Sequence, residues 1–355
     1  FQMRGTNNRA VLEGHLAAKG TVSLVPGNVG IDVRVQGERL RAGAGFAAAK
    51  LDARVAWTQI PGVPLGKKPI ELDLDARDVV AASVRLASIA AIVRGTSDEH
   101  RAVVRARIAD NDVETSLAGA LDGETMQWRG AMEAFRSSGR ADVRLEAPAK
   151  LELARDRVAL ASARLRFAES EFRVDDLPVE QGRITSHGAF TGVPAETVAR
   201  LADASLPFTT DVAFGGAWSI AATPRLGGTI SIRRERGDVR YDAGPGASRE
   251  EASIGLSRLD LDVRVADDAI DGSATLASAR SGSATLAFAI APSPTAAPGT
   301  LRGDAPLTAR FDGEWPSLKL LQPWLGTTAI ADGRLRVALE ANGTLGTPVL
   351  AGKIA

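Results

Sequence analysis

Apolar and polar residues alternate along most of the chain, and this alternation limits the possible folds more than any other feature. Val29, Ile31, Val33 and Val35 lie on one side of an extended segment, with polar residues between them. The same pattern places these further apolar residues on one face: Val104, Ile108, Val143, Leu145, Leu259, Leu261, Val263, Leu286, Phe288 and Leu339. A period of two is that of a β-strand. One apolar face and one polar face are typical of an antiparallel sheet that is wet on one side.

Turn signals separate the alternating segments, for example Asp122-Gly123 and Asp271-Gly272. The segment 271–280 is nearly repeated by 281–290, which suggests a sheet that grows by adding similar units. About 30 strands of ordinary length would fit in the chain, and open twisted sheets curl when they exceed about ten strands. We therefore predict a mostly β fold: an elongated, curled, antiparallel-rich sheet that forms an apolar trough.

Few segments depart from this pattern. Residues 192–204 and 315–326 have the spacing of short helices, and 292–300 reads as a loop or an insertion. No change in composition marks a firm domain boundary. The sequence thus predicts a single elongated segment over residues 1–355, with soft breaks near 184–204 and 292–300.

Composition excludes several classes of function. The chain of 355 residues carries 43 Lys and Arg against 43 Asp and Glu, so it has no basic field to hold nucleic acid. It has no cysteine, which excludes disulfides, thiolate catalysis and cysteine-ligated zinc. No signal peptide is visible, and the most apolar stretch, 79–93, is too short to span a bilayer. We expect a piece of a longer protein, truncated at both ends, whose targeting elements lie elsewhere.

Motifs that would carry chemistry are weak. Gly43, Gly45 and Ala48 superficially match a dinucleotide fingerprint but lie among alternating strands rather than in a βαβ unit. The segment 110–114 resembles a calcium loop but lacks its glycine and its distal glutamate, so a hairpin turn is the simpler interpretation. No catalytic pair, metal-ligand spacing or cofactor site is visible. The sequence predicts a protein that is not an enzyme and that holds no cofactor.

The histidines and tryptophans do not change this interpretation. The histidines are scattered and read as isolated surface residues: His15, His100 and His187. The tryptophans fall at intervals: Trp57, Trp128, Trp218, Trp315 and Trp324. We expect the tryptophans to pack locally at a sheet edge or under a short helix, with stacking on a substrate as the alternative.

Three segments carry a family likeness. Residues 125–167 combine a Trp-x-Gly strand, a polar break and an apolar strand that contains a Pro-Ala step. Residues 184–240 combine a short helix, a Gly-x-Trp strand and an Ile-Arg-Arg-Glu hairpin. Residues 310–355 contain the unit Gly-Thr-Leu-x-x-Pro-x-Leu-x-Gly. With these motifs in this order, the chain resembles an interior part of the TamB family, the periplasmic subunit of the translocation and assembly module, and its AsmA-like relatives.

The resemblance implies a folded sheet, the β-taco, that bridges the inner and outer membranes of a Gram-negative periplasm. It implies phospholipid acyl chains as cargo, a role in outer-membrane biogenesis and an outer-membrane barrel partner resembling TamA. It also implies an inner-membrane anchor outside this chain. The 14 apolar residues named above are then the candidate lipid groove. Two other functions stay open: a scaffold for assembling outer-membrane β-barrels or autotransporters by strand addition, and a β-helical surface adhesin.

Overall fold

A computed structural model describes residues 12–25, 28–42, 46–60, 62–63, 67–81, 84–139, 142–201, 206, 208–240, 253–297, 299–317 and 333–355. These residues form 23 strands and one helix. Twenty-one of the described strands belong to an antiparallel sheet, and the other two form a small sheet of their own. The chain divides into two compact units, unit 1 (Phe1–Ala168) and unit 2 (Glu169–Ala355).

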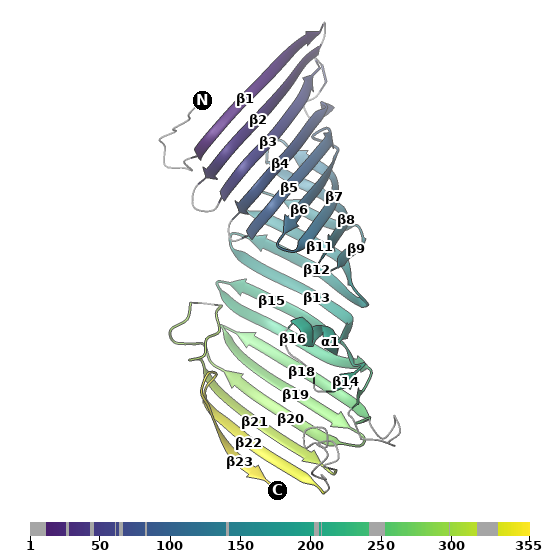
Figure 1. Ribbon diagram of the computed structural model, residues 1–355, viewed down its shortest axis with the longest axis vertical. Helices are drawn as coiled ribbons and strands as arrows, with labels where there is room; N and C mark the ends of the chain where they lie inside the picture. The colour runs from purple at the N-terminus through teal and green to yellow at the C-terminus, as the bar shows by residue number, and fades with distance from the viewer. Residues whose placement is uncertain are drawn as a thin grey trace. The chain divides into compact units, whose positions relative to one another are not determined.

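Unit 1 is a meander in which each of the first eight strands pairs with the next along the chain (Figure 1). Its strands are β1 (Leu12–Val25), β2 (Asn28–Ala42), β3 (Phe46–Gln59), β4 (Ile70–Ala81), β5 (Val84–Gly95), β6 (His100–Ile108), β7 (Asn111–Asp122), β8 (Gln127–Ser138), β9 (Val143–Ala147), β10 (Ala149–Leu153) and β11 (Arg157–Phe167). Strands β9 and β10 are two halves of one position between β8 and β11, separated by Pro148. Proline has no N–H to donate to a ladder, which explains the split.

Unit 2 repeats the meander. Its elements are β12 (Ser170–Glu180), β13 (Arg183–Pro194), α1 (Ala195–Leu201), β14 (Thr209–Thr210), β15 (Ala213–Thr223), β16 (Arg225–Arg236), β17 (Val239–Arg240), β18 (Leu256–Ala266), β19 (Ala269–Ser278), β20 (Gly282–Ile290), β21 (Pro306–Trp315), β22 (Leu335–Thr344) and β23 (Pro348–Ile354). The short strands β14 and β17 pair with each other, and the other strands pair in chain order.

Two-residue turns hold successive strands together. Gln181-Gly182 and Asp267-Asp268 both have positive φ at each residue, from 49° to 79°. This is the type I′ conformation, whose twist matches that of the strands it joins. Such short connections force neighbours in sequence to be neighbours in the sheet, so the meander follows from local turns.

The mostly β, antiparallel fold predicted from the alternation is confirmed. The expected number of about 30 strands was too high, because many strands here are 9 to 15 residues long whereas strands in globular proteins average about five or six. The helix expected within 192–204 is present as α1. Trp315 ends β21 and so lies in a strand instead of opening a helix; residues 318–326 lie outside the described residues. The segment 110–114 is a hairpin, with Asn111 as the first residue of β7.

Few apolar side chains of the described residues are fully buried. The accessible surface of the chain is 22672 Å² at 37.0 kDa, whereas a compact globular protein of that mass would expose about 14,000 Å². Buried apolar side chains gather in small clusters, one around Leu40 and Val79 in unit 1 and one around Val212, Ile254 and Leu256 in unit 2. Most of the sheet therefore lacks a second layer on its apolar side.

Candidate functional site: an uncovered apolar sheet face

The apolar residues of unit 2 align in rows that cross the sheet. One row joins facing residues of eight strands: Trp218, Ile230, Val263, Gly272, Phe288, Ala309, Ala341 and Leu350. A second row lies two residues further along the strands: Gly216, Ile232, Leu261, Ala274, Leu286, Phe311, Leu339 and Gly352. Eight strands spaced by about 4.8 Å give rows about 34 Å long. We call this side of unit 2 its apolar face.

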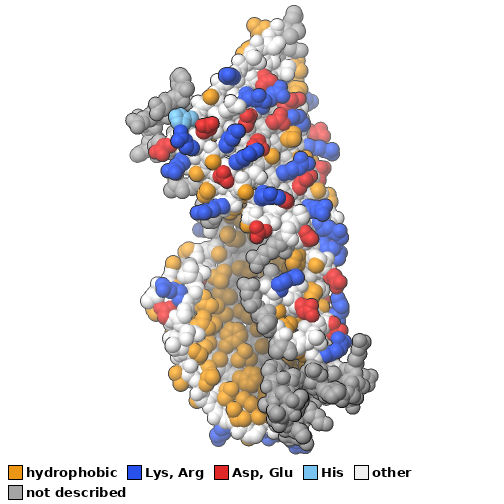
Figure 2. Space-filling view, in the orientation of Figure 1, with side chains coloured by type: hydrophobic (Ala, Val, Ile, Leu, Met, Phe, Trp, Pro, Cys, Tyr) orange, Lys and Arg blue, Asp and Glu red, His pale blue; other side chains and the backbone are white. Residues whose placement is uncertain are grey.

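Figure 2 shows hydrophobic side chains gathered in a hollow over the strands of unit 2, with charged side chains outside it. The row residues Ile230, Val263 and Phe288 are half-buried, although no second sheet covers them. The curl of the sheet and the neighbouring side chains give them this partial cover. An apolar surface of this kind can exclude water from a ligand without enclosing it.

All 14 residues predicted to line the groove are half-buried. In unit 2, Val263 and Phe288 share the first row, and Leu261, Leu286 and Leu339 share the second. Leu259 lies in the next row, opposite Leu276. The remaining eight belong to unit 1: Val29, Ile31, Val33, Val35, Val104, Ile108, Val143 and Leu145. Of these, Val35 and Val104 share a row through Ala53, Leu74 and Ala91. Whether any of the 14 binds lipid stays a prediction.

The aromatic residues of the apolar face lie over glycines on neighbouring strands. A Cβ added at Gly188 would come within 2.3 Å of the Trp218 ring, and one at Gly272 within 2.2 Å of the Phe288 ring. The Phe172, Phe190 and Trp218 rings form a stack, with centroids 5.8 Å and 6.4 Å apart. Rings that lie flat on glycine do not project from the sheet. The lining of unit 2 therefore stays shallow despite its large aromatic side chains.

The tryptophans are placed differently from the prediction. Trp128 and Trp218 lie on interior strands of their units, not at a sheet edge or under a helix. The Trp218 Nε1–H donates to Ser186 Oγ at 2.9 Å, so its polar atom is satisfied inside the apolar face. Trp57 is 37% exposed on β3, Trp315 stacks on Phe311, and Trp324 lies outside the described residues.

The three histidines also differ from one another. His15 is exposed on β1, as predicted. His100 is half-buried, and its Nε2 accepts a hydrogen bond of 2.7 Å from Trp128 Nε1. His187 pairs through Nδ1 with Asp176 Oδ1 at 2.7 Å. The prediction of isolated surface histidines was therefore wrong for His100, which is half-buried; His187 lies at the surface as predicted but is not isolated. Their partners are distant in sequence, at separations of 28 and 11 residues.

Charged residues gather on the opposite side, the polar face. Arg54 donates from Nε and Nη2 to both carboxylate oxygens of Asp32, and these hydrogen bonds lower the pKa of Asp32 below its usual range. Arg107 does the same for Asp112 across the β6–β7 hairpin. In unit 2, Arg233 donates to Asp262 at 2.8 Å, and this bond raises the Arg233 pKa. The lowered pKa keeps Asp32 and Asp112 charged at neutral pH, and such charges keep one face of the sheet wet.

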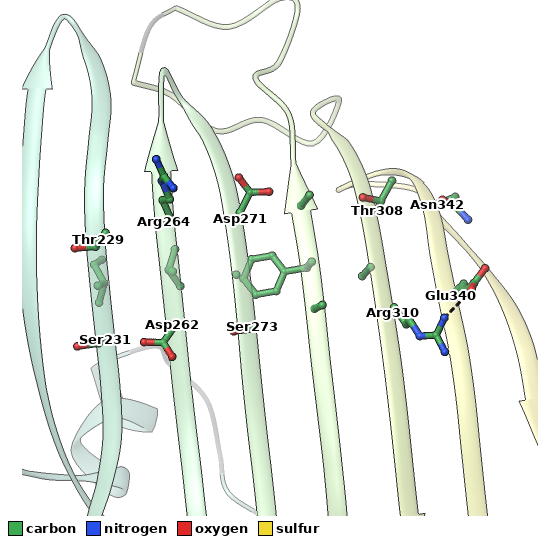
Figure 3. A pocket seen from close by; sticks show the side chains of 17 residues that line it. Thr229, Ser231, Asp262, Arg264, Asp271, Ser273, Thr308, Arg310, Glu340 and Asn342 are labelled. Carbon is green, nitrogen blue, oxygen red and sulfur yellow. Dashed lines mark ion pairs between the residues drawn. The ribbon is translucent and has the colours of Figure 1, made fainter.

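A hollow of about 910 Å³ lies on the polar face of unit 2 (Figure 3). Consecutive residues of successive strands line it, among them the polar Asp262, Asp271 and Arg310 and the first-row residues Val263 and Phe288. Arg310 lies 3.8 Å from Glu340. A twisted sheet curves in opposite senses along its two diagonals, so both faces can be hollowed. The lining of this hollow therefore combines charges of both signs with apolar side chains.

Two kinds of site are absent from the part of the chain that the structure describes. No cluster of three or more histidine or acidic residues there has the geometry to hold a metal ion. The described helix is too short to cross a bilayer. The dinucleotide-fingerprint match involved Gly43, Gly45 and Ala48. Gly43 and Gly45 lie outside the described residues, and Ala48 is buried within β3.

Several residues of the apolar face were missed from the sequence. Ile230 and Ile232 in β16 and Phe311 in β21 obey the same alternation and could have been found by it. The Gly-x-Trp and Gly-x-Phe spacings could have indicated Trp218 and Phe190, because a glycine leaves room for an aromatic ring from the neighbouring strand. Their contacts join β13 to β15 and require the register, which single strands do not specify.

Comparison with known proteins gives one positive result. Neither the curated proteins nor the solved structures include a match to the chain. The family model described as "TamB, N-terminal domain" matches residues 12–355. That match covers the meanders of both units, so the chain belongs to the TamB family, within its N-terminal domain.

Proposed function

We propose that this chain is a periplasmic bridge segment that shields phospholipid acyl chains from water during transport between the inner and outer membranes. The observation that supports the proposal is the pair of apolar rows on a sheet face that no second sheet of the described residues covers, with most charges on the other face. Each methylene withdrawn from water contributes about 0.8 kcal/mol, so shielding twelve of them stabilises an acyl chain by about 10 kcal/mol.

Transfer requires that the lipid also leave. Small and flat side chains such as Ala274, Leu286 and Phe288 over Gly272 offer many similar contacts and no deep pocket. An acyl chain can then move between positions of nearly equal free energy. No hydrogen bonds need to be broken as the acyl chain moves, because the rows contain few polar side chains. The proposed role is transport rather than catalysis, and no residue is assigned to a chemical step.

Family membership supports the location and the partner. TamB proteins belong to the translocation and assembly module, so we place the chain in the periplasm, with an inner-membrane anchor outside residues 1–355 and an outer-membrane barrel resembling TamA as its partner.

A pair of adjacent substitutions on β16 tests the lipid role. Ile230 is half-buried on the apolar face, and Thr229 is exposed on the polar face beside Arg264. Ile230→Asp puts a carboxylate in the first row, whereas Thr229→Asp adds the same charge to the wet side. We expect phospholipid to co-purify with wild type and with Thr229→Asp, and to be lost from Ile230→Asp. Ile230→Ser is the milder variant if the aspartate prevents folding. Equal lipid content in all variants would refute the proposal.

A scaffold for outer-membrane protein assembly is the second candidate, because β23 presents an exposed strand. Val349, Leu350 and Ile354 are 66%, 66% and 71% exposed, and β23 pairs on one side only, with β22, among the described residues. An extended client segment could add to this edge by main-chain hydrogen bonds. Photo-crosslinkers at Val349 should then capture nascent barrel chains, and their absence would remove this candidate. The antiparallel pairing of successive strands argues against the adhesin alternative, because a β-helix stacks its strands in parallel.

A further inference from the structure

One charged side chain of β16 lies on the apolar face of unit 2, beyond the two rows and near the end of the strand. Arg234 lies two residues beyond Ile232 on β16, and the register pairs it with Phe214 on β15. It therefore belongs to the apolar face, whereas its neighbour Arg233 belongs to the polar face. Arg236, at the end of β16, lies 3.9 Å from Glu169.

Among the described residues, the contacts of Arg234 leave its charge uncompensated. Its Nε and Nη2 donate to the carbonyl oxygen of Gly237 at 2.9 Å and 2.6 Å, and its Nη1 donates to that of Ser257 at 3.5 Å. No carboxylate of the described residues forms an ion pair with it. In contrast, Arg233 pairs with Asp262 and Arg240 pairs with Asp211. Backbone carbonyls hold the guanidinium in place, and two of its five N–H groups have no acceptor among the described residues.

Its position in unit 2 is specific. Phe214 and Leu259 pack against the buried cluster of Val212, Ile254 and Leu256, together with Ala195 of α1. This cluster covers one end of the apolar face, and Arg234 is half-buried beside it. A lipid whose acyl chains lie along the uncovered rows would bring its polar group to such a boundary. A fixed, half-buried guanidinium is well suited to the planar recognition of a phosphate.

We propose that Arg234 binds the phosphate of a phospholipid whose acyl chains lie on the apolar face of unit 2. This inference rests on the proposed lipid role and adds a named contact for the head group. It makes unit 2 selective for phosphate-bearing lipids over neutral ones of the same chain length. The backbone clamp at Gly237 and Ser257 orients the guanidinium before the lipid arrives.

The test compares two lipids and three variants of the whole chain. Binding of a short-chain phosphatidylglycerol and of the diacylglycerol with the same acyl chains is measured for wild type, Arg234→Gln, Arg234→Lys and Arg233→Gln. We expect Arg234→Gln to weaken phosphatidylglycerol binding about tenfold while diacylglycerol binding stays unchanged. Arg234→Lys should retain part of the preference. Arg233→Gln is the matched control on the opposite face and should bind both lipids as wild type does.

Each of the remaining outcomes would contradict either the proposed lipid role or the proposed role of Arg234. Failure of wild type to bind either lipid would refute the proposed lipid role itself. Equal loss of both lipids in Arg234→Gln would show that Arg234 only clamps the end of β16, and unchanged binding would show that it does not contact the head group. Binding of inorganic phosphate is measured as well. If phosphate binds wild type but not Arg234→Gln, while neither lipid depends on Arg234, the ligand of Arg234 is free phosphate and the inference is overturned.

Discussion

Gly272→Ala is the sharpest perturbation of the apolar face. The three heavy atoms nearest to an added Cβ all belong to the Phe288 ring, at 2.2, 2.4 and 2.9 Å. No backbone atom is that close, and Gly272 does not have a positive φ. The substitution therefore acts on one movable target: the Phe288 ring must leave its place over β19 and rise from the lining of unit 2.

Two effects should follow from this displacement. Forcing an extra carbon into a packed contact typically costs about 1–3 kcal/mol. For a unit of this size, each kcal/mol lowers the melting midpoint by about 2–4 °C. The raised ring should also narrow the path along the first row, so lipid transfer should slow more than lipid binding weakens.

The assay combines thermal melting with phospholipid transfer by the whole protein. Gly227→Ala is the matched control, because a Cβ there meets nothing closer than Val265 O at 3.8 Å. Phe288→Ala in the Gly272→Ala background removes the ring and should restore transfer, with a favourable coupling free energy of about 1 kcal/mol or more between the two sites. If Gly272→Ala melts and transfers like Gly227→Ala, the flat-ring account of the lining is wrong.

Three further predictions follow from contacts outside the rows. Burial alone would raise the pKa of Asp238, but hydrogen bonds from Ser253 and from the N–H groups of Leu256, Val239 and Gly255 lower it. Its stabilising contribution is therefore present above the usual carboxyl pKa of about 4 and is lost as the pH falls through the lower, folded value. Asp238→Asn should lower the free energy of unfolding by about 1 kcal/mol at pH 7, after allowance for solvent screening. The variant should also lose less stability than wild type between pH 5 and pH 3. Melting profiles in acid that are the same for both proteins would contradict this. His100→Ala removes the acceptor of the Trp128 N–H and should destabilise unit 1 by about 1–3 kcal/mol with a shift in Trp fluorescence, whereas His100→Gln should retain most of the stability; equal melting of both variants and wild type would exclude a role for the bond. Asp32→Asn breaks an exposed pair on the polar face and should leave lipid content at the wild-type level, and a loss of lipid there would show that the polar face takes part.

The local pattern predicted much of the fold. Alternation at Val29–Val35 and at Leu259–Val265 assigned the faces of β2 and β18 correctly, because a period of two determines which side chains share a face. Turns such as Asp122-Gly123 separated strands that indeed pair in sequence order. Strand length was not predictable in the same way, because β2 and β4 continue past local irregularities at Arg39 and Asp78, where φ is positive.

What the pattern could not supply was the register between strands. The placement of Phe288 over Gly272, the bond from Trp128 to His100 and the pairing of Arg234 with Phe214 all join residues of different strands. Period two assigns Arg234 to the same face as Ile230 and Ile232, yet a single charged residue at a strand end is easily taken as solvent-exposed. Only the register brings it beside Phe214 and the buried cluster, where its charge has consequences.

The central claim is that lipid contacts one face of the sheet and not the other. The most direct measurement places a photo-crosslinking residue at each position from Leu259 to Val265 on β18 and quantifies captured phospholipid. We predict strong labelling at Leu259, Leu261, Val263 and Val265, and little at Asp260, Asp262 and Arg264. Labelling that rises and falls with every second residue would support the apolar face as the lipid path. Equal labelling at all seven positions, or labelling of the charged positions alone, would contradict it.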